Sequence, residues 1–320
     1  MAGDNPPSDI DLRVNDTREM TLAPVVESLC EVTEGLAHAK QRGQCRRALP
    51  ERTALIEMIE SLRAVLFPGY FGVSDLSQES MRFYVGSALD RVFGILQEHV
   101  KRGLCFVCGD DPHRCPEVER QALSITKDFV ARLPAVRHVL ATDVQAAYEG
   151  DPAATSPDEA IFCYPGVMAI TNYRLAHELY QLKVPLIPRI ITEHAHGTTG
   201  IDIHPGATIG DHFFIDHGTG IVIGETCLIG NRVRIYQGVT LGAKSFPLDE
   251  DGHPIKGIPR HPIVEDDVII YSGATILGRV TIGRGSTIGG NVWLTHSVPP
   301  RSRVTQAQAR ESGFEAGAGI

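Results

Sequence analysis

The stretch that decides the fold begins at Ile203 and reads IHPGATIGDHFFIDHGTGIVIGETCLIGNRVRIYQGV as far as Val239. Every sixth residue in it is apolar and of small to medium size: Ile203, Ile209, Ile215, Ile221, Cys227, Val233 and Val239. The same spacing resumes further along the chain, at Val264, Ile270, Ile276, Ile282, Ile288 and Leu294. A period of six fits neither an α-helix nor a flat β-strand. It predicts a left-handed parallel β-helix of hexapeptide repeats, in which short strands turn corners and each directs one residue inward.

The two sets of apolar residues are out of phase, which predicts an insertion between them. Val264 follows Val239 by 25 positions, which is not a multiple of six. The intervening segment, residues 243–262, is polar and rich in proline and glycine. A loop of this length without secondary structure of its own is usually functional or disordered. We expect a functional loop that is extruded from the β-helix.

The first half of the chain has helical rather than six-residue periodicity. We expect residues 1–20 to be loose and residues 21–190 to form an α-helical domain. Residues 191–304 are expected to form the β-helix, and residues 305–320 a flexible C-terminal tail. The predicted fold class is therefore α+β, with the helices and the strands in separate parts of the chain.

Prolines and glycines divide the helical region into separate predicted helices. Breaks are expected near Pro68 and between Cys105 and Pro116. Pro134 is expected to interrupt the next helix, because proline lacks a backbone N–H and clashes with the preceding turn. Gly150 is expected to end that segment, and a further helix is expected over residues 165–183.

Composition argues against several classes of function. The 320 residues carry a net charge of −9, which is not typical of a nucleic-acid-binding surface. Nowhere do about 18 apolar residues run together, so no membrane-spanning helix is expected. The N-terminus lacks the basic and apolar regions of a signal peptide. Seven cysteines, an odd number in a long chain, do not indicate a disulfide framework. We expect a cytoplasmic protein.

A cluster of metal-ligating residue types lies in the helical region. The four residues Cys105, Cys108, His113 and Cys115 fall within eleven positions and could close a tetrahedral zinc site. Their spacing is tighter than that of the usual paired zinc ligands. The alternative is a turn between helices that carries reduced cysteines, and the spacing leaves both interpretations open.

Polar residues gather within the first set of repeats. Asp202 lies next to the inward-facing Ile203, and Asp216 and His217 follow the inward-facing Ile215. These three polar side chains are therefore expected at corners or on outer faces. A histidine can act as a general base near neutral pH, with a carboxylate orienting its ring. The alternative is that these residues only satisfy the backbone of glycine-rich turns.

Several short segments together resemble the serine O-acetyltransferases, a family of hexapeptide-repeat acyltransferases. In the β-helix they are Ile201–Pro205 (IDIHP), Ile215–Thr226 (IDHGTGIVIGET), Gly238–Gly242 (GVTLG) and Arg260–Pro262 (RHP). In the helical region they are Asp143–Ala147 (DVQAA), Asp151–Ala153 (DPA) and Tyr173–His177 (YRLAH). Hexapeptide repeats alone are shared by many acyltransferases, whereas DHGTG and RHP together are specific. The likeness covers roughly residues 140–300.

The resemblance implies a role for each matched polar residue. His217 matches the general base of the family, and Asp202 matches the carboxylate that pairs with it. An arginine suits a substrate carboxylate, because its planar fork can bond both oxygens. The residues that match the serine-binding site are Asp151, Asp216, Arg260 and His261.

The resemblance also implies ligands and partners. Acetyl-CoA is the expected acetyl donor, lying along the β-helix between neighbouring subunits, and no metal is required. Its contacts are expected at the backbone of Ala243, Ser272 and Gly290. L-cysteine is the expected feedback inhibitor, and the expected assembly is a homotrimer or a dimer of trimers. The tail that ends in Ile320 resembles the segment by which this family docks into O-acetylserine sulfhydrylase.

The predicted reaction is acetyl transfer from acetyl-CoA to the hydroxyl of L-serine, the first step of cysteine biosynthesis. Three alternatives stay open. Another hexapeptide acyltransferase would use a different acceptor, but such enzymes lack the pair Arg260 and His261. A zinc enzyme of the gamma carbonic anhydrase type would need three histidines that converge between subunits. A non-catalytic scaffold would not require the polar corners.

Overall fold

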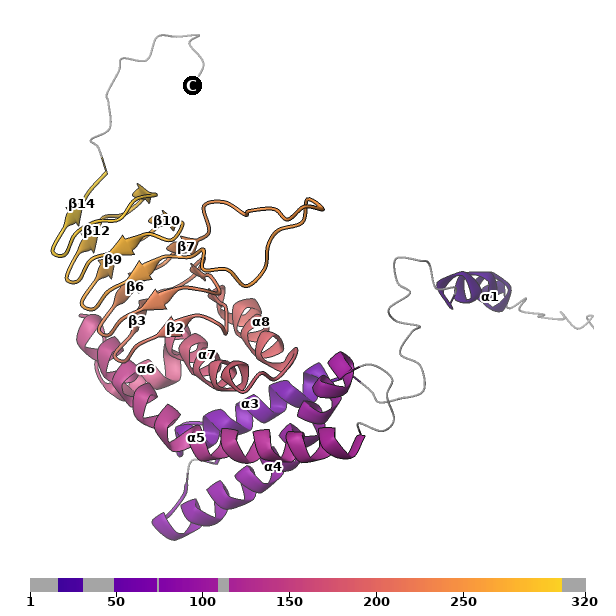
Figure 1. Cartoon of the computed structure of the whole chain (residues 1–320). Coiled ribbons are helices and arrows are strands. Elements are labelled where there is room, and N and C mark those ends of the chain that lie inside the picture. Colours follow the sequence, from indigo (N-terminus) through magenta and orange to yellow (C-terminus); the bar gives the residue numbers. More distant parts are fainter. Residues whose placement is uncertain (1–16, 31–48, 74, 109–114, 307–320) are drawn as a thin grey trace, which may run out of the picture. The chain divides into compact units, whose positions relative to one another are not determined.

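The computed structural model describes residues 17–30, 49–73, 75–108 and 115–306. The chain divides into two compact units, one made of residues 1–46 and 109–112 and the other of the remaining residues. Helix α1 (Thr17–Cys30) belongs to the first unit. The other described helices and the strands belong to the second unit (Figure 1).

Helices occupy the first part of the second unit. They are α3 (Arg52–Leu66), α4 (Gln78–Cys108), α5 (Cys115–Gly150), α6 (Pro157–Cys163), α7 (Pro165–Gln181) and α8 (Ile187–Thr199). The predicted break near Pro68 is confirmed, and so is the end of a helix at Gly150. The predicted break between Cys105 and Pro116 includes residues 109–114, which lie outside the described residues. Within the described residues, no helix has the length and the apolar character needed to span a membrane.

The predicted interruption at Pro134 is wrong, because α5 continues through it. Apolar residues on both sides of the proline are buried at helical spacing, namely Phe129, Leu133, Val136 and Leu140. Packing of this continuous stripe outweighs the single backbone hydrogen bond that proline removes. The predicted boundary between residues 190 and 191 falls inside α8, and the first strand begins at Asp202.

Short strands then coil into three parallel sheets, which form a left-handed β-helix (Figure 1). The first sheet contains β1 (Asp202–Ile203), β4 (Val222–Ile223), β7 (Thr240–Gly242), β10 (Thr275–Leu277) and β13 (Trp293–Leu294). The second sheet contains β2 (Thr208–Ile209), β5 (Leu228–Ile229), β8 (Ile263–Val264) and β11 (Thr281–Ile282). The third sheet contains β3 (Phe214–Asp216), β6 (Arg234–Tyr236), β9 (Ile269–Ile270), β12 (Thr287–Ile288) and β14 (Arg303–Val304).

The six-residue repeat is confirmed, since each residue of both predicted sets is at most 7% exposed. Full burial of such side chains stabilises a fold by roughly 1.5–3 kcal/mol each. Successive strands fall on successive sheets, so the corners stack into edges. We call the edge between the third and first sheets, which contains residues 217–221, the His217 edge. The edge between the first and second sheets, which contains residues 224–227, is the Arg260 edge.

The insertion lies between β7 and β8, in the interval between the two sets of repeats, and the structure places it on the Arg260 edge. Its residues Leu248 and Pro254 form an antiparallel bridge. The sheets keep their register across it, because β7 pairs with β10 and β8 pairs with β5. The loop therefore leaves and rejoins the β-helix without disturbing the stacking of the coils.

A buried ion pair joins the helices to the first coil. Arg174 of α7 donates two hydrogen bonds to the carboxylate of Asp143 on α5, at 2.6 and 2.9 Å. The same arginine donates to the carbonyl of Gly210 at 2.8 Å, and Asp143 accepts the N–H of Phe213 at 2.9 Å. These bonds fix the corner that precedes β3, the strand that carries Asp216.

Candidate active site

A pocket of about 420 Å³ opens where the junction of α6 and α7 meets the end of β3. Three separate parts of the chain line it: the turn after α5, the junction itself and the His217 edge. Its lining includes Asp151, Tyr164, Gly166, Asp216, His217 and Thr219. The pocket thus brings together three residues predicted for the site, Asp151, Asp216 and His217.

His217 is the exposed nitrogen base of this pocket. Its Nε2 lies 3.7 Å from Oδ1 of Asp216, and its side chain is 76% exposed while that of Asp216 is 15% exposed. Burial raises the pKa of Asp216, and the nearby His217 opposes that change. The backbone of His217 has a φ of 55°, a left-handed conformation that residues other than glycine adopt mainly at turns and functional sites. An accessible imidazole of this kind can take a proton from a bound hydroxyl.

Asp151 is the ionised carboxylate of the pocket. The hydroxyl of Tyr164 donates to its Oδ2 at 2.6 Å, and the N–H of Ala153 donates to its Oδ1 at 2.8 Å. The hydrogen bond from Tyr164, followed by that from Ala153, lowers the pKa of Asp151. Burial, followed by the same bond to Asp151, raises the pKa of the Tyr164 hydroxyl. The pocket therefore presents a negative charge to a positively charged ligand group.

A second polar group lies on the Arg260 edge. Arg260 Nη2 donates to Oε2 of Glu225 at 2.7 Å, and the hydroxyl of Tyr180 lies 3.3 Å from the other oxygen of this carboxylate. Burial alone would raise the pKa of Glu225, but the hydrogen bond from Arg260 and the charge of nearby His204 hold it below its ordinary value. The guanidinium is thus held by a charged partner on the preceding coil of the same edge.

His261 is buried beside this ion pair. Burial, followed by the charge of Arg260, lowers the pKa of His261 to about 4, so the ring is neutral at pH 7. Its Nδ1 accepts the N–H of Thr226 at 3.1 Å, which leaves the proton of the neutral ring on Nε2. The ring packs so closely on Gly224 that a Cβ there would lie 2.1 Å from its Cδ2. His261 is therefore held as a hydrogen-bond donor of fixed orientation.

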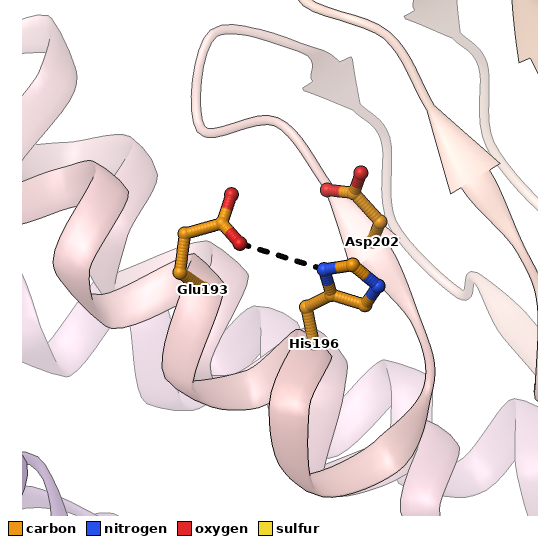
Figure 2. A group of neighbouring side chains, drawn as sticks. All are labelled: Glu193, His196 and Asp202. Atoms are coloured by element: carbon orange, nitrogen blue, oxygen red, sulfur yellow. Dashed lines mark hydrogen bonds and ion pairs between the residues drawn. The ribbon is translucent and has the colours of Figure 1, made fainter.

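Asp202 lies on β1 of the first sheet, where its N–H donates to the carbonyl of Ile221 on the His217 edge at 2.9 Å. Figure 2 shows it facing Glu193 and His196 of α8, and the ligand atoms of the three residues lie within 4.8 Å of one another. In the described part of the chain, no hydrogen bond or ion pair joins Asp202 to His217. The carboxylate next to His217 in this conformation is Asp216.

Two groups of described residues have donor sets that could hold a cation. One is Glu193, His196 and Asp202, although Glu193 already forms ion pairs with Arg189 and His196. The other is the exposed set in the loop, Asp249, Asp251 and His253. The predicted zinc site at Cys105, Cys108, His113 and Cys115 includes His113, which lies outside the described residues, so that site stays a prediction. Ile320 also lies outside them.

The three residues predicted at the acetyl-CoA backbone lie on both edges. Ser272 and Gly290 follow β9 and β12, on the same edge as His217. Ala243 follows β7, on the same edge as Arg260. Within the chain, therefore, the structure brings together the members of each edge but not the two edges, which the strands of the first sheet separate.

Reasoning from the sequence missed several polar residues of these sites. Glu225 and Thr226 stand inside the segment IDHGTGIVIGET but received no role, because a six-residue pattern says only that such positions face outward. Tyr164 was missed because the helical pattern marks Pro165 only as a helix start. A tyrosine directly before such a start, thirteen residues after Asp151, carries no signal of its own.

Known proteins resemble both the sequence and the fold. A family model described as bacterial transferase hexapeptide (six repeats) matches residues 261–296. The protein named "Serine acetyltransferase, plasmid" of Synechococcus elongatus is 53% identical over 312 residues, which cover 96% of this chain and 98% of that protein.

Solved structures agree with that relationship. Serine acetyltransferase isoform 3 of Entamoeba histolytica, in complex with cysteine, has a TM-score of 0.68 at 32% identity, covering 91% of this chain and 92% of its own. Soybean serine acetyltransferase complexed with serine has a TM-score of 0.51 at 28% identity, covering 82% and 99%. With this likeness over nearly its whole length, the chain belongs to the serine acetyltransferase family of hexapeptide-repeat transferases.

Proposed function

We propose that this enzyme transfers the acetyl group of acetyl-CoA to the hydroxyl of L-serine, giving O-acetyl-L-serine and CoA as the first step of cysteine biosynthesis. The chain is an acyltransferase by its membership of the family. The observation that carries the proposal is the pocket on the His217 edge, where an exposed histidine lies beside two carboxylates. A base for a hydroxyl and an anion for an ammonium are the groups that this acceptor needs.

Serine would be held by residues of both edges. Asp151 and Asp216 suit its ammonium group, and Arg260 suits its carboxylate, since a guanidinium fork can bond both oxygens. His261, which is neutral and has its proton on Nε2, suits the hydroxyl of the substrate. The same set suits cysteine, which differs from serine only in its thiol. A relative in complex with cysteine supports inhibition by that amino acid.

The separation of the two edges supports an assembly of several copies. Within one chain, Arg260 and His217 follow different sheets of the coil, with the first sheet between them. A serine molecule is too small to reach across that sheet. In a cyclic trimer, the His217 edge of one copy can face the Arg260 edge of the next. A complete serine site would then form at each contact between copies.

In the reaction, His217 would remove the proton of the serine hydroxyl as its oxygen attacks the carbonyl carbon of the thioester. The tetrahedral intermediate then collapses, the C–S bond breaks, and the protonated imidazole returns the proton to the sulfur of CoA. Asp202 is proposed to orient the ring. Because the His217 side chain is exposed, its ring can rotate toward Asp202. In the present conformation the carboxylate next to the ring is that of Asp216.

Acetyl-CoA would extend along the His217 edge toward the C-terminal coils, because helices α5, α7 and α8 pack against the first coil at the other end of the β-helix. Tyr236 pairs in register with Asp216, and its ring stacks on that of Tyr271 one coil further on, at 5.0 Å and 18° between planes. Coils are spaced by about 4.8 Å, so the ring of Tyr236 lies one coil beyond Asp216 in the C-terminal direction, and the ring of Tyr271 lies two coils beyond it. Ser272 and Gly290 continue the same edge, and Ala243 would come from the neighbouring copy.

Tyr271→Ala should raise the KM for acetyl-CoA a few-fold without changing that for serine.

Three further expectations remain part of the proposal. The tail that ends in Ile320 is proposed to dock into O-acetylserine sulfhydrylase, feedback inhibition is assigned to L-cysteine, and the enzyme is placed in the cytoplasm. Deletion of Ile320 should abolish binding to the sulfhydrylase in a titration and leave acetyl transfer intact. Binding that survives the deletion would contradict the role of the tail.

The activity is tested by measuring CoA release from acetyl-CoA with different acceptors. Serine should support turnover well above that of other amino acids and of amino sugars. Free cysteine should inhibit competitively with serine. Turnover that is equal with amino sugars, or absent with serine, would overturn the proposed acceptor.

A further inference from the structure

We propose that Tyr164 is a positioning residue that holds the carboxylate of Asp151 in the orientation in which it binds the ammonium group of the amino-acid substrate. This inference rests on the proposed function, because it takes Asp151 as the ligand of that ammonium. Tyr164 does not need to contact the reacting atoms, since it acts through the carboxylate to which it donates.

The two carboxylate oxygens of Asp151 accept hydrogen bonds from different donors. Oδ2 accepts the hydroxyl of Tyr164 at 2.6 Å, and Oδ1 accepts the N–H of Ala153 at 2.8 Å. A carboxylate with one donor on each oxygen keeps further lone pairs free. Because Asp151 and Tyr164 both line the pocket, the free lone pairs are available to a ligand there.

The donor itself is held by fixed backbone. Tyr164 lies between α6 and α7, where its N–H donates to the carbonyl of Ala160 at 3.2 Å and Pro165 begins the next helix. Two residues on, Gly166 packs against β3 so tightly that a Cβ would lie 2.6 Å from the carbonyl oxygen of Ile215. The backbone that carries Tyr164 is thus fixed relative to the strand that carries Asp216, and the hydroxyl is held by its bond to Asp151.

The charges around the pair give the bond a second effect. Asp151 shares the pocket with Asp216, and repulsion between two close carboxylates favours protonation of one of them. The bond from Tyr164 lowers the pKa of Asp151, while burial raises that of Asp216. The other charged groups that face these residues are His217, Glu159 and Arg234. Tyr164 therefore favours Asp151 as the carboxylate that stays ionised as the pH falls.

The test is the variant Tyr164→Phe, which keeps the ring and removes only the hydroxyl. The KM for serine should rise about tenfold, as expected for the loss of a hydrogen bond to a charged group, while kcat and the KM for acetyl-CoA stay within about twofold. Because the pKa of Asp151 rises without its donor, serine binding should weaken at a higher pH in the variant than in the wild type. Calorimetric titration with serine gives the same comparison without turnover.

A matched control is Tyr70→Phe, which removes another tyrosine–carboxylate bond, from Tyr70 to Asp158 of α6, outside the pocket lining. This variant should bind serine like the wild type. If Tyr164 acts through Asp151, Tyr164→Phe should weaken binding no further in an Asp151→Asn background. Additive losses, or an unchanged serine Kd in the single variant, would overturn the inference. If the wild type released no CoA with serine, the proposed function would be overturned instead. Calorimetric serine binding by the two single variants and the double variant would still decide the role of Tyr164.

Discussion

Each of the two edges of the β-helix carries a histidine near a carboxylate, but the histidine is exposed on one edge and buried on the other. On the His217 edge, the imidazole is 76% exposed and the pocket beside it is open. On the Arg260 edge, the imidazole of His261 is 7% exposed and the guanidinium is already paired with Glu225. One histidine is free to exchange protons with a ligand, whereas the other is fixed as a donor. The same side chain therefore serves chemistry on one edge and recognition on the other, and burial makes the difference.

The largest effect is expected from breaking the open edge. His217→Ala should lower kcat by about 10²–10⁴, the usual loss when a general base is removed. Folding should hardly change, because the side chain is exposed. His212 has the same left-handed backbone at another corner, with a φ of 59°, so His212→Ala is a matched control that should retain most of the turnover. Steady-state CoA release measures both variants. Near-normal turnover in His217→Ala would contradict the assignment of the base.

The next effect concerns the anchor beneath the open edge. Asp143→Ala would leave Arg174 buried without its partner, and the loss of one member of a buried ion pair costs about 3–5 kcal/mol in the free energy of unfolding. The exposed pair of Arg232 and Asp267 offers the control, because Asp267→Ala should cost no more than about 1 kcal/mol. Urea unfolding gives both values. Equal losses would mean that the buried pair does not attach the helices to the β-helix.

A smaller effect is expected at the recognition edge. Arg260→Lys should raise the KM for serine about tenfold, because lysine cannot reproduce a two-point bond to a carboxylate. Cysteine inhibition should weaken in parallel, whereas the KM for acetyl-CoA should change little. The same rise for both substrates would place Arg260 at the donor site instead. Initial rates with each substrate varied in turn provide the measurement.

The smallest effect is a pH dependence of stability from His261. Its pKa in the folded chain is about 4, below the ordinary value of 6.5, so the unfolded state binds the proton more readily between these values. The free energy of unfolding should therefore rise with pH through this window and level off above it. Urea unfolding of the wild type and of His261→Gln at several pH values isolates the contribution. A wild-type slope no steeper than that of the variant would contradict burial of a neutral ring.

The repeat was predictable because it depends on one property at one spacing. An inward position must be apolar, so Ile215 and Ile276 are recognised without any knowledge of their neighbours. The outward positions carry no such rule, which is why Asp216 could be assigned to an outer face but not to a particular edge. Pro134 shows the limit for helices, since tertiary packing overrode its local preference.

The site was predictable only in part, because it forms between segments that are distant in the sequence. Asp151 and His217 carry family motifs, and the pocket unites them. Tyr164 bonds Asp151 through the path of the chain around α6, which no spacing encodes. The pairing of Asp202 with His217 stays a prediction, as do the ligands that depend on a neighbouring copy.

The extruded loop makes one part of this enzyme free to vary in length. Arg260 and His261 are held where the chain returns, since both their N–H groups donate to Oγ1 of Thr226, at 2.9 and 3.2 Å. The C-terminal end of the loop is thus anchored to a side chain of the preceding coil. The entropy of closing a loop grows only slowly with its length. Insertions, affinity tags or fluorescent reporters placed near Gly252 should therefore be accepted, and evolution can lengthen this loop without moving the residues that bind the substrate.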